Sequence, residues 1–394
     1  MSSRRSARIG RAPKRSLLAS TTTTTTPPTR CSPYFWGFTK RPRHPVDKLR
    51  APGNDLNRGN PLAAPSAWIP TNELPSHLIG NDYFDDNNNS NRKNGSTTLL
   101  LRTDTPEGFS LSQAICSYGY ICLAPNRWVP GKPTDGTAAG GEDDEGYLVR
   151  PLTHRRTAAS SKGPPAWKTA RVAIGQDPTT GSVLVAIDDS SALLDQGDQR
   201  QQLTAQIDRM LRLDNTSLEV FHELCPDAKE RGFGRLYRSP TLLEYVIKTI
   251  TNCNMKWGGT VEMNAKLCQH VGRDGAFLTP EEIHAVGPDF LKERCRVGYR
   301  GKYIWAIARN ICEGTLDLAS ALGSNPNGRC HHARCDVQKR LLELSGIGPF
   351  TANNILQLMG YFDTHPYDTE TVRLWKEEFG ASKSATKAEV FEAP

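Results

Sequence analysis

The sequence predicts an α+β protein with a disordered tail over residues 1–105, a small β-rich domain over residues 106–190 and a mainly helical domain over residues 191–394. Low-complexity composition marks the tail, short β-branched runs mark the middle part, and apolar residues at helical spacing mark the remainder. The 394 residues are enough for this arrangement, because a single hydrophobic core usually stops growing well below that size.

The tail combines a threonine tract, Thr21–Thr26, with proline-rich joints and an Asn/Asp-rich stretch over residues 81–94. Such composition buries too little apolar surface to offset chain entropy, so we expect disorder. Asp47 is the one acidic residue among the first fifty, which suits a mitochondrial or plastid transit peptide. The basic clusters Lys14–Arg15 and Lys40–Arg43 favour a nuclear import signal, and we place the protein in the nucleus first.

The formal net charge of +7 favours an anionic partner without choosing between nucleic acid and a membrane surface. No run of about 18 apolar residues occurs, so we expect no membrane-spanning segment. The ten cysteines are scattered, several of them within expected helices, which is typical of reduced thiols. Cys330, His331, His332 and Cys335 have the ligand types of a zinc site, but they lie in a polar loop without a second ligand pair, so we predict no metal there.

The middle part contains short segments that are interpreted as strands. Residues 109–111 begin one, and residues 118–123 form another. Residues 131–146 are rich in glycine and acidic residues and predict a long surface loop. The β-branched runs over residues 172–174 and 183–187 flank an Asp-Pro-Thr-Thr-Gly turn, which predicts a hairpin.

After about residue 190, apolar residues recur at helical spacing. Two such faces, which we expect to be core, comprise Leu203, Ile207, Met210 and Leu211 in one helix and Leu243, Val246, Ile247 and Ile250 in another. Thr279 followed by Pro280 has the form of an N-cap with proline at the first helical position.

The most informative stretch runs over residues 341–356, where a tight Gly346-Ile347-Gly348 hairpin joins two expected helices. Glycines permit unusual backbone angles and leave no side chain over the amides, and Pro349 fixes the first helical φ without removing a needed donor. Free N–H groups at a helix N-terminus bind anions, so the hairpin predicts a DNA phosphate site. Glycines also end many helices for purely structural reasons.

The run from Leu344 to Asn354, Leu-Ser-Gly-Ile-Gly-Pro-Phe-Thr-Ala-Asn-Asn, resembles the helix-hairpin-helix of the HhH-GPD superfamily of DNA glycosylases. The resemblance reaches from about Phe109 to the end and is nearest to the 3-methyladenine glycosylase II and 8-oxoguanine glycosylase branches. In that family a Gly/Pro-rich turn and an invariant aspartate follow the hairpin. Residues 360–367 and Asp368 stand at those positions here.

The resemblance implies a base excision repair enzyme with Asp368 as its catalytic carboxylate. A carboxylate beside C1′ stabilises the positive charge that develops on the sugar and orients or deprotonates the attacking water. The target base must first leave the stack, which is easiest where it is damaged. Asp368 also has the sequence context of a helix N-cap, and the two roles are compatible.

Bifunctional members of the family carry a hairpin lysine, and Phe350 occupies that position here, so we predict a monofunctional enzyme. An aromatic residue there resembles the 3-methyladenine branch and suits cationic alkylated purines. We assign Phe350, Trp257 and Tyr299 to the base pocket. Ordinary core packing is the equal alternative for Phe350.

The resemblance also implies DNA contacts. At the hairpin these are Gly346, Ile347, Gly348 and Thr351, and elsewhere they are Asn254, Arg300 and Lys302. Asn254 matches an asparagine that fills the hole left by the extruded base, with a capping role as the alternative. For Arg300 and Lys302 the alternative is a surface-exposed pair without DNA contact.

We expect damaged double-stranded DNA as the partner, no membrane and a monomer. No redox cofactor is implied, no iron–sulfur cluster is expected because no cysteine follows Cys335, and a monovalent cation at the hairpin is a further expectation. The sequence stops at Pro394, where the family usually continues through a helix that closes the pocket, so a truncated gene product is one interpretation. The rival functions are a noncatalytic helix-hairpin-helix DNA-binding protein and an 8-oxoguanine-type glycosylase.

Overall fold

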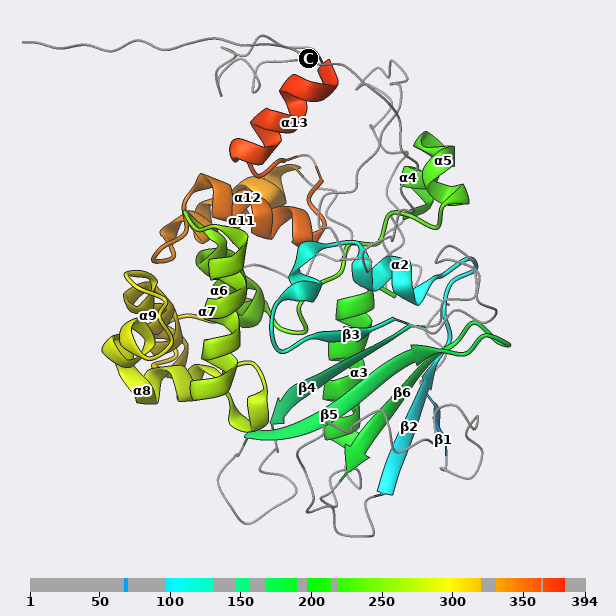
Figure 1. The fold of residues 1–394 in the computed structure, drawn as a ribbon, viewed down its shortest axis with the longest axis horizontal. Coiled ribbons are helices and arrows are strands. Elements are labelled where there is room, and N and C mark those ends of the chain that lie inside the picture. The colour runs from blue at the N-terminus through cyan, green and yellow to red at the C-terminus, as the bar shows by residue number, and fades with distance from the viewer. Residues whose placement is uncertain are drawn as a thin grey trace, which may run out of the picture. The chain divides into compact units, whose positions relative to one another are not determined.

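The computed structural model describes residues 67–69, 97–130, 146–155, 167–189, 197–213, 218–319, 331–362 and 364–379. All of them belong to the compact unit Trp36–Pro394, whereas the unit Met1–Phe35 lies outside the described residues. The architecture is α+β, as predicted, with an antiparallel sheet followed along the chain by helices (Figure 1). Within the described ranges, no helix has the length and apolar character that crossing a bilayer requires.

The described strands form one six-stranded sheet in the order β1-β2-β6-β5-β4-β3, and all neighbours in it are antiparallel. The strands are β1 (Ala67–Ile69), β2 (Thr97–Thr103), β3 (Arg127–Val129), β4 (Tyr147–Arg155), β5 (Trp167–Gln176) and β6 (Val183–Asp189). The predicted hairpin is confirmed as β5 and β6, where Val172 lies opposite Ile187. In its turn, the Asp177 carboxylate accepts a hydrogen bond of 2.9 Å from the Thr179 N–H.

One face of the sheet packs against α3 (Gly197–Leu211) (Figure 1). Because strand side chains alternate between faces, Val172 and Val185 reach the same core as Leu203 and Ile207 of the helix. The apolar spacing that predicted this helix is confirmed, since all four residues on its face are buried.

Two segments of the predicted strands are helical instead. Residues 109–111 lead into α2 (Leu111–Cys116), whose N-cap Ser110 accepts a side-chain hydrogen bond from a backbone N–H. Residues 118–123 contain the 3-10 helix η4 (Gly119–Cys122). The strand interpretation is wrong because apolar residues of both segments enter the core beneath the sheet from helical turns, not from an extended chain.

The expected disorder over residues 1–105 is wrong where the structure describes this part. Strand β2 pairs with β6 over its whole length, with Thr97 opposite Asp189 and Thr103 opposite Val183. Its sequence, Thr-Thr-Leu-Leu-Leu-Arg-Thr, is the apolar and β-branched run that strands favour. The rest of the tail and residues 131–145 of the expected loop lie outside the described residues, and the domain division near residue 190 stays a prediction.

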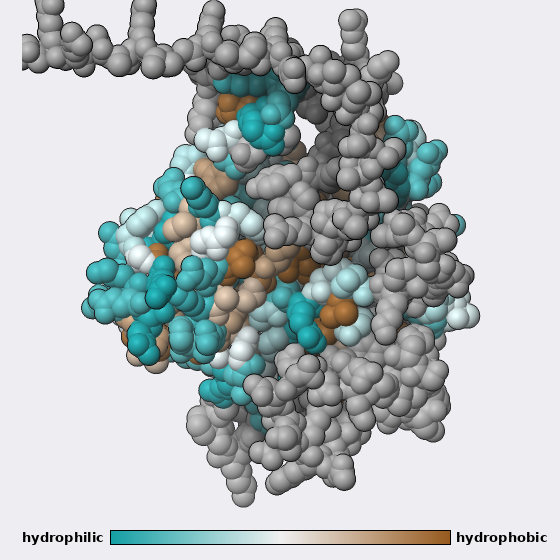
Figure 2. All heavy atoms as spheres, in the orientation of Figure 1, coloured by the Kyte–Doolittle hydropathy of each residue, from teal (hydrophilic) through white to brown (hydrophobic). Residues whose placement is uncertain are grey.

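After α3 the described chain is helical. The elements are α4 (Leu218–Leu224), α5 (Pro226–Glu230), α6 (Leu242–Asn252), α7 (Trp257–His270), η7 (Arg273–Gly275), α8 (Pro280–Glu293), α9 (Arg300–Cys312), α11 (His331–Glu343), α12 (Pro349–Met359) and α13 (Thr369–Phe379). Side chains such as Ile247, Ile304 and Ile355 share one apolar core. Hydrophilic side chains dominate the outer surface over α8 and α9 in the view of Figure 2.

The start of α8 confirms the predicted cap. Thr279 accepts a hydrogen bond of 3.3 Å from the Glu282 N–H, and the Glu282 carboxylate accepts one of 2.9 Å from the Thr279 N–H. Pro280 occupies the first helical turn. This reciprocal capping box satisfies two backbone donors that a helix start leaves without partners.

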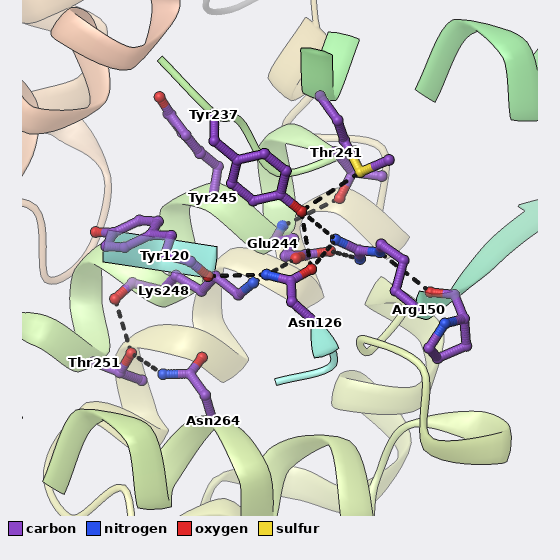
Figure 3. A network of polar contacts seen from close by, with 12 residues as sticks. Tyr120, Asn126, Arg150, Tyr237, Thr241, Glu244, Tyr245, Lys248, Thr251 and Asn264 are labelled. Atoms are coloured by element: carbon purple, nitrogen blue, oxygen red, sulfur yellow. Dashed lines mark hydrogen bonds and ion pairs between the residues drawn. The ribbon is translucent and has the colours of Figure 1, made fainter. Parts of the chain in front are cut away.

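A buried ionic network joins the sheet to α6 (Figure 3). Arg150 of β4 lies 2.8 Å from one Glu244 oxygen, and the Lys248 ammonium lies 2.7 Å from the other. Arg150 also donates to the Asn126 side-chain oxygen, which accepts a second hydrogen bond from the Tyr237 hydroxyl. Burial alone would raise the pKa of the Glu244 carboxyl, but the two cations hold it below its ordinary value. The network therefore fixes the position of α6, the helix that ends beside the candidate site.

Candidate functional site

The hairpin between α11 and α12 has the geometry that its glycines predict. Gly346 has a φ of 82°, and a Cβ there would lie 2.7 Å from the ring of Tyr303 on α9. Both the left-handed backbone and the close ring require glycine. Gly348 is the N-cap of α12 and Pro349 follows within its first turn, as predicted. The first turn of α12 therefore offers backbone N–H groups to an anion.

Two of the predicted hairpin contacts have buried side chains. Ile347 is 7% exposed, and its N–H donates to the Leu344 carbonyl at 3.1 Å. Thr351 is 1% exposed, and its hydroxyl oxygen lies 2.9 Å from the Cys253 sulfur. These side chains hold the hairpin against the protein, so a phosphate contact is left to the backbone.

Arg300 holds the turn between α6 and α7. Its guanidinium is buried and donates to the carbonyls of Ile250 (3.2 Å), Cys253 and Asn254 (3.3 Å). The predicted direct DNA contact by this side chain is wrong because the side chain is buried and its nitrogens donate to the turn and to the Val297 carbonyl. The alternative of a surface-exposed Arg300 is also wrong, and the residue is instead a buried support for Asn254.

Asn254 stands exposed at the tip of that turn with a φ of 50°, a conformation that asparagine tolerates better than most residues. The N-cap of α7 is Lys256, so the capping alternative for Asn254 is wrong. The neighbouring Met255 is 41% exposed. Insertion of Asn254 into DNA stays a prediction.

The start of α9 lies beside the hairpin because Tyr303 packs against Gly346. Tyr299 is 50% exposed, and its ring meets the Tyr303 ring edge to face at 6.1 Å. The exposed Lys302 ammonium lies 5.0 Å from the centre of the Tyr303 ring. Tyr299 and Lys302 thus lie on the hairpin side of α9. Trp257 opens α7 and packs partly against the helical core, so the pocket roles of Trp257 and Tyr299 stay predictions.

Asp368 caps α13, as predicted. Its Oδ1 accepts a hydrogen bond of 2.8 Å from the Thr371 N–H. The Thr371 hydroxyl lies 3.0 Å from both Asp368 Oδ1 and the Pro366 carbonyl oxygen and donates its proton to one of them. Oδ2 makes no hydrogen bond to a residue that the structure describes, and the side chain is half-buried. One oxygen is therefore held while the other is left for chemistry.

The buried amide of Asn353 connects α12 to the segment that carries Asp368. Its Nδ2 donates to the His365 carbonyl at 2.9 Å, and its Oδ1 accepts from Gln338 of α11 at 2.8 Å. Gly360, with a φ of 104°, ends α12 in the left-handed conformation. The turn before Asp368 is thus attached to both helices of the hairpin.

Sequence reasoning missed the next residue, Asn354, and its partners. Asn354 Nδ2 donates to the Tyr118 hydroxyl at 2.8 Å, while the Tyr120 hydroxyl donates to Thr249 at 2.9 Å and lies 3.4 Å from Asn354 Oδ1. Burial raises the pKa of Tyr118 to about 12, and the Asp368 carboxylate adds to the rise. Consecutive asparagines in an otherwise apolar helix were the available signal, because buried amides need partners.

Among the described residues, no group of three or more His, Cys, Asp or Glu is arranged to hold a metal ion. Cys335 is exposed on α11, and Cys330 lies outside the described residues. His331 and His332 belong to the first turn of α11.

No protein-family model matches the chain, and no curated protein sequence matches it either. Among solved structures, the chain is similar to the apo form of Clostridium acetobutylicum 8-oxoguanine glycosylase/lyase, with 17% identity over 74% of this chain and 89% of that chain and a TM-score of 0.47. The chain is also similar to the complex of that enzyme with double-stranded DNA containing cytosine opposite 8-oxoG, with 16% identity over 74% of this chain and 87% of that chain and a TM-score of 0.46. Similarity to the 3-methyladenine DNA-glycosylase of Archaeoglobus fulgidus extends over 59% of this chain and 81% of that chain, with 17% identity and a TM-score of 0.37.

Proposed function

We propose that this protein is a DNA N-glycosylase that extrudes an alkylated purine from double-stranded DNA and hydrolyses its N-glycosidic bond. The carboxylate of Asp368 carries the proposal. It stands at the N-terminus of α13, its Oδ1 is held by Thr371, and Oδ2 is left without a partner among the described residues. The carboxylate follows a glycine hairpin whose backbone suits a phosphate.

The reaction needs little else from the protein. The bond between C1′ and the purine nitrogen breaks with its electron pair leaving on the base, and the water oxygen bonds to C1′. Asp368 stabilises the positive charge on the sugar, and its Oδ2 accepts the proton of the water. A cationic alkylated purine departs as a neutral base, so this substrate class needs no general acid.

Two lysines bear on the proposal that the enzyme is monofunctional. Phe350 occupies the hairpin position where a lysine would attack C1′. Lys248 is fully buried, and its ammonium is ion-paired with Glu244 at 2.7 Å. Lys302 is exposed on α9, where its ammonium lies over Tyr303. We therefore propose hydrolysis to an abasic site without strand cleavage. We further propose that the enzyme is a monomer and acts in the nucleus.

The test is base release from duplexes that carry 7-methylguanine, 3-methyladenine or 8-oxoguanine, compared between the native chain and Asp368→Asn. Asparagine keeps the N-cap but removes the charge, so we expect unchanged folding and a loss of at least about 100-fold in the rate of release. Strand cleavage is measured separately and is expected to be absent.

Asp227→Asn is the matched control, because this exposed aspartate lies in the first turn of α5 and belongs neither to the hairpin nor to α13. It should release base at the native rate. A native chain that binds duplex DNA but releases no base would favour the noncatalytic DNA-binding function. Release of 8-oxoguanine alone would change the proposed substrate from an alkylated purine to 8-oxoguanine.

A further inference from the structure

Tyr118 lies where the core beneath the sheet meets the core of the helical region, and it has no role in the reaction proposed above. Its ring packs against the core beneath the sheet and also against the core of the helical region. It is only partly buried, whereas the neighbouring Tyr120 is 2% exposed. The two rings meet edge to face at 4.8 Å. Of the two tyrosines, Tyr118 therefore keeps surface for a ligand.

The hydroxyl of Tyr118 is held from α12. Asn354 donates to it at 2.8 Å, and Asn354 lies four residues after Phe350, on the same face of the helix. Accepting this bond does not use the phenolic proton. Tyr118 is thus fixed along the helix face that carries Phe350, where its hydroxyl also interacts with that of Tyr120.

The same helix links Tyr118 to the catalytic carboxylate. Asn353, next to Asn354, is bonded to the His365 carbonyl in the turn before Asp368. The influence of Asp368 on the pKa of Tyr118 agrees with this proximity.

We propose that Tyr118 forms part of the base pocket beside Phe350 and Asp368 and donates a hydrogen bond to an acceptor atom on the extruded purine. This assignment rests on the proposed glycosylase function. Tyr118 comes from the segment between β2 and β3 of the sheet, so the proposed pocket combines residues of the sheet region and of the helical region. Tyr120 has a different role, because its hydroxyl is spent on Thr249 within the protein.

The experiment compares Tyr118→Phe with Tyr120→Phe, two changes that each remove one hydroxyl from the same cluster. In single-turnover release of 7-methylguanine, Tyr118→Phe should slow the reaction about tenfold, the effect of one lost hydrogen bond of about 1.4 kcal/mol. Tyr120→Phe should stay within about twofold of the native rate, because its hydroxyl bonds inside the protein. Thermal unfolding of both variants monitors the fold.

A binding measurement separates this proposal from the proposed function. In the Asp368→Asn background, the affinity for a 7-methylguanine duplex is compared with that for an undamaged duplex, with and without Tyr118→Phe. A fall in this preference supports base contact by Tyr118, even if the native chain releases no base and the glycosylase proposal fails. Native release with unchanged rate and preference in Tyr118→Phe would overturn the Tyr118 assignment alone. Absence of both release and preference would overturn both.

Discussion

Two neighbouring turns of the helical region are built by opposite means. The hairpin over residues 346–348 takes its shape from the left-handed backbone of Gly346, whereas the turn at Asn254 is held by the guanidinium of Arg300, which is distant in the sequence. Thr351 joins them through its contact with Cys253. A loop whose shape depends on its own residues can therefore be predicted from the sequence, whereas a loop held by a side chain distant in the sequence cannot.

The largest effect is expected from breaking the remote support. Arg300→Met removes a buried cation that donates to four backbone carbonyls, and we expect a loss of about 3 kcal/mol in the free energy of unfolding. Urea unfolding gives this value, and duplex affinity reports on the turn. Arg300→Lys should not rescue either quantity, because an ammonium lacks the fork of donors. Native affinity in Arg300→Met would show that the turn keeps its shape without the guanidinium.

His154 is buried in strand β4, which the sequence pattern around it did not predict. Burial, and secondarily Lys168, lowers the pKa of His154 to about 4. Since the unfolded state binds the proton from about pH 6.5 downward, stability is complete above that pH and falls as the pH drops from about 6.5 to about 4. The loss attributable to His154 is at most about 3 kcal/mol. Unfolding measured across this range should show a flatter dependence in His154→Leu, and parallel curves would contradict the assignment.

The glycine hairpin supplies a matched pair of smaller changes. Gly346→Ala meets both the left-handed φ and the Tyr303 ring, so we expect a loss of about 1–2 kcal/mol in unfolding free energy. Gly348→Ala has open space around its new Cβ and should change stability by less than about 0.5 kcal/mol. Its methyl group would cover the amides instead, so its affinity for duplex DNA should fall. Equal stability losses in the two variants would refute the local account of the hairpin.

The smallest effect tests the link between the two turns. Thr351→Val keeps the shape of the side chain and removes its contact with Cys253, which should lower the unfolding free energy by about 1 kcal/mol or less because thiols form weak hydrogen bonds. Cys253→Ala is measured beside it, together with the double variant. If the losses in unfolding free energy of the two single variants simply add in the double variant, the two turns are held independently.

Much of the candidate site followed from local pattern. The hairpin, the start of α12 at Pro349 and the capping role of Asp368 depend on interactions within a few residues, and all three are present in the structure. Arg300 was misassigned because its burial depends on the carbonyls of a turn some fifty positions earlier. Tyr118 was missed because its partner, Asn354, is 236 positions away.

By itself, the sequence determined the glycine backbone of the hairpin, the capped helices and the apolar faces that bury them, since φ preferences, caps and helical periodicity are local properties. The tertiary structure alone decided that β2 joins the sheet, that Arg150 meets Glu244 and that Tyr118 reaches the helix before Asp368. The physical reason is that strand partners, burial and the pairing of buried polar groups depend on residues distant in the chain.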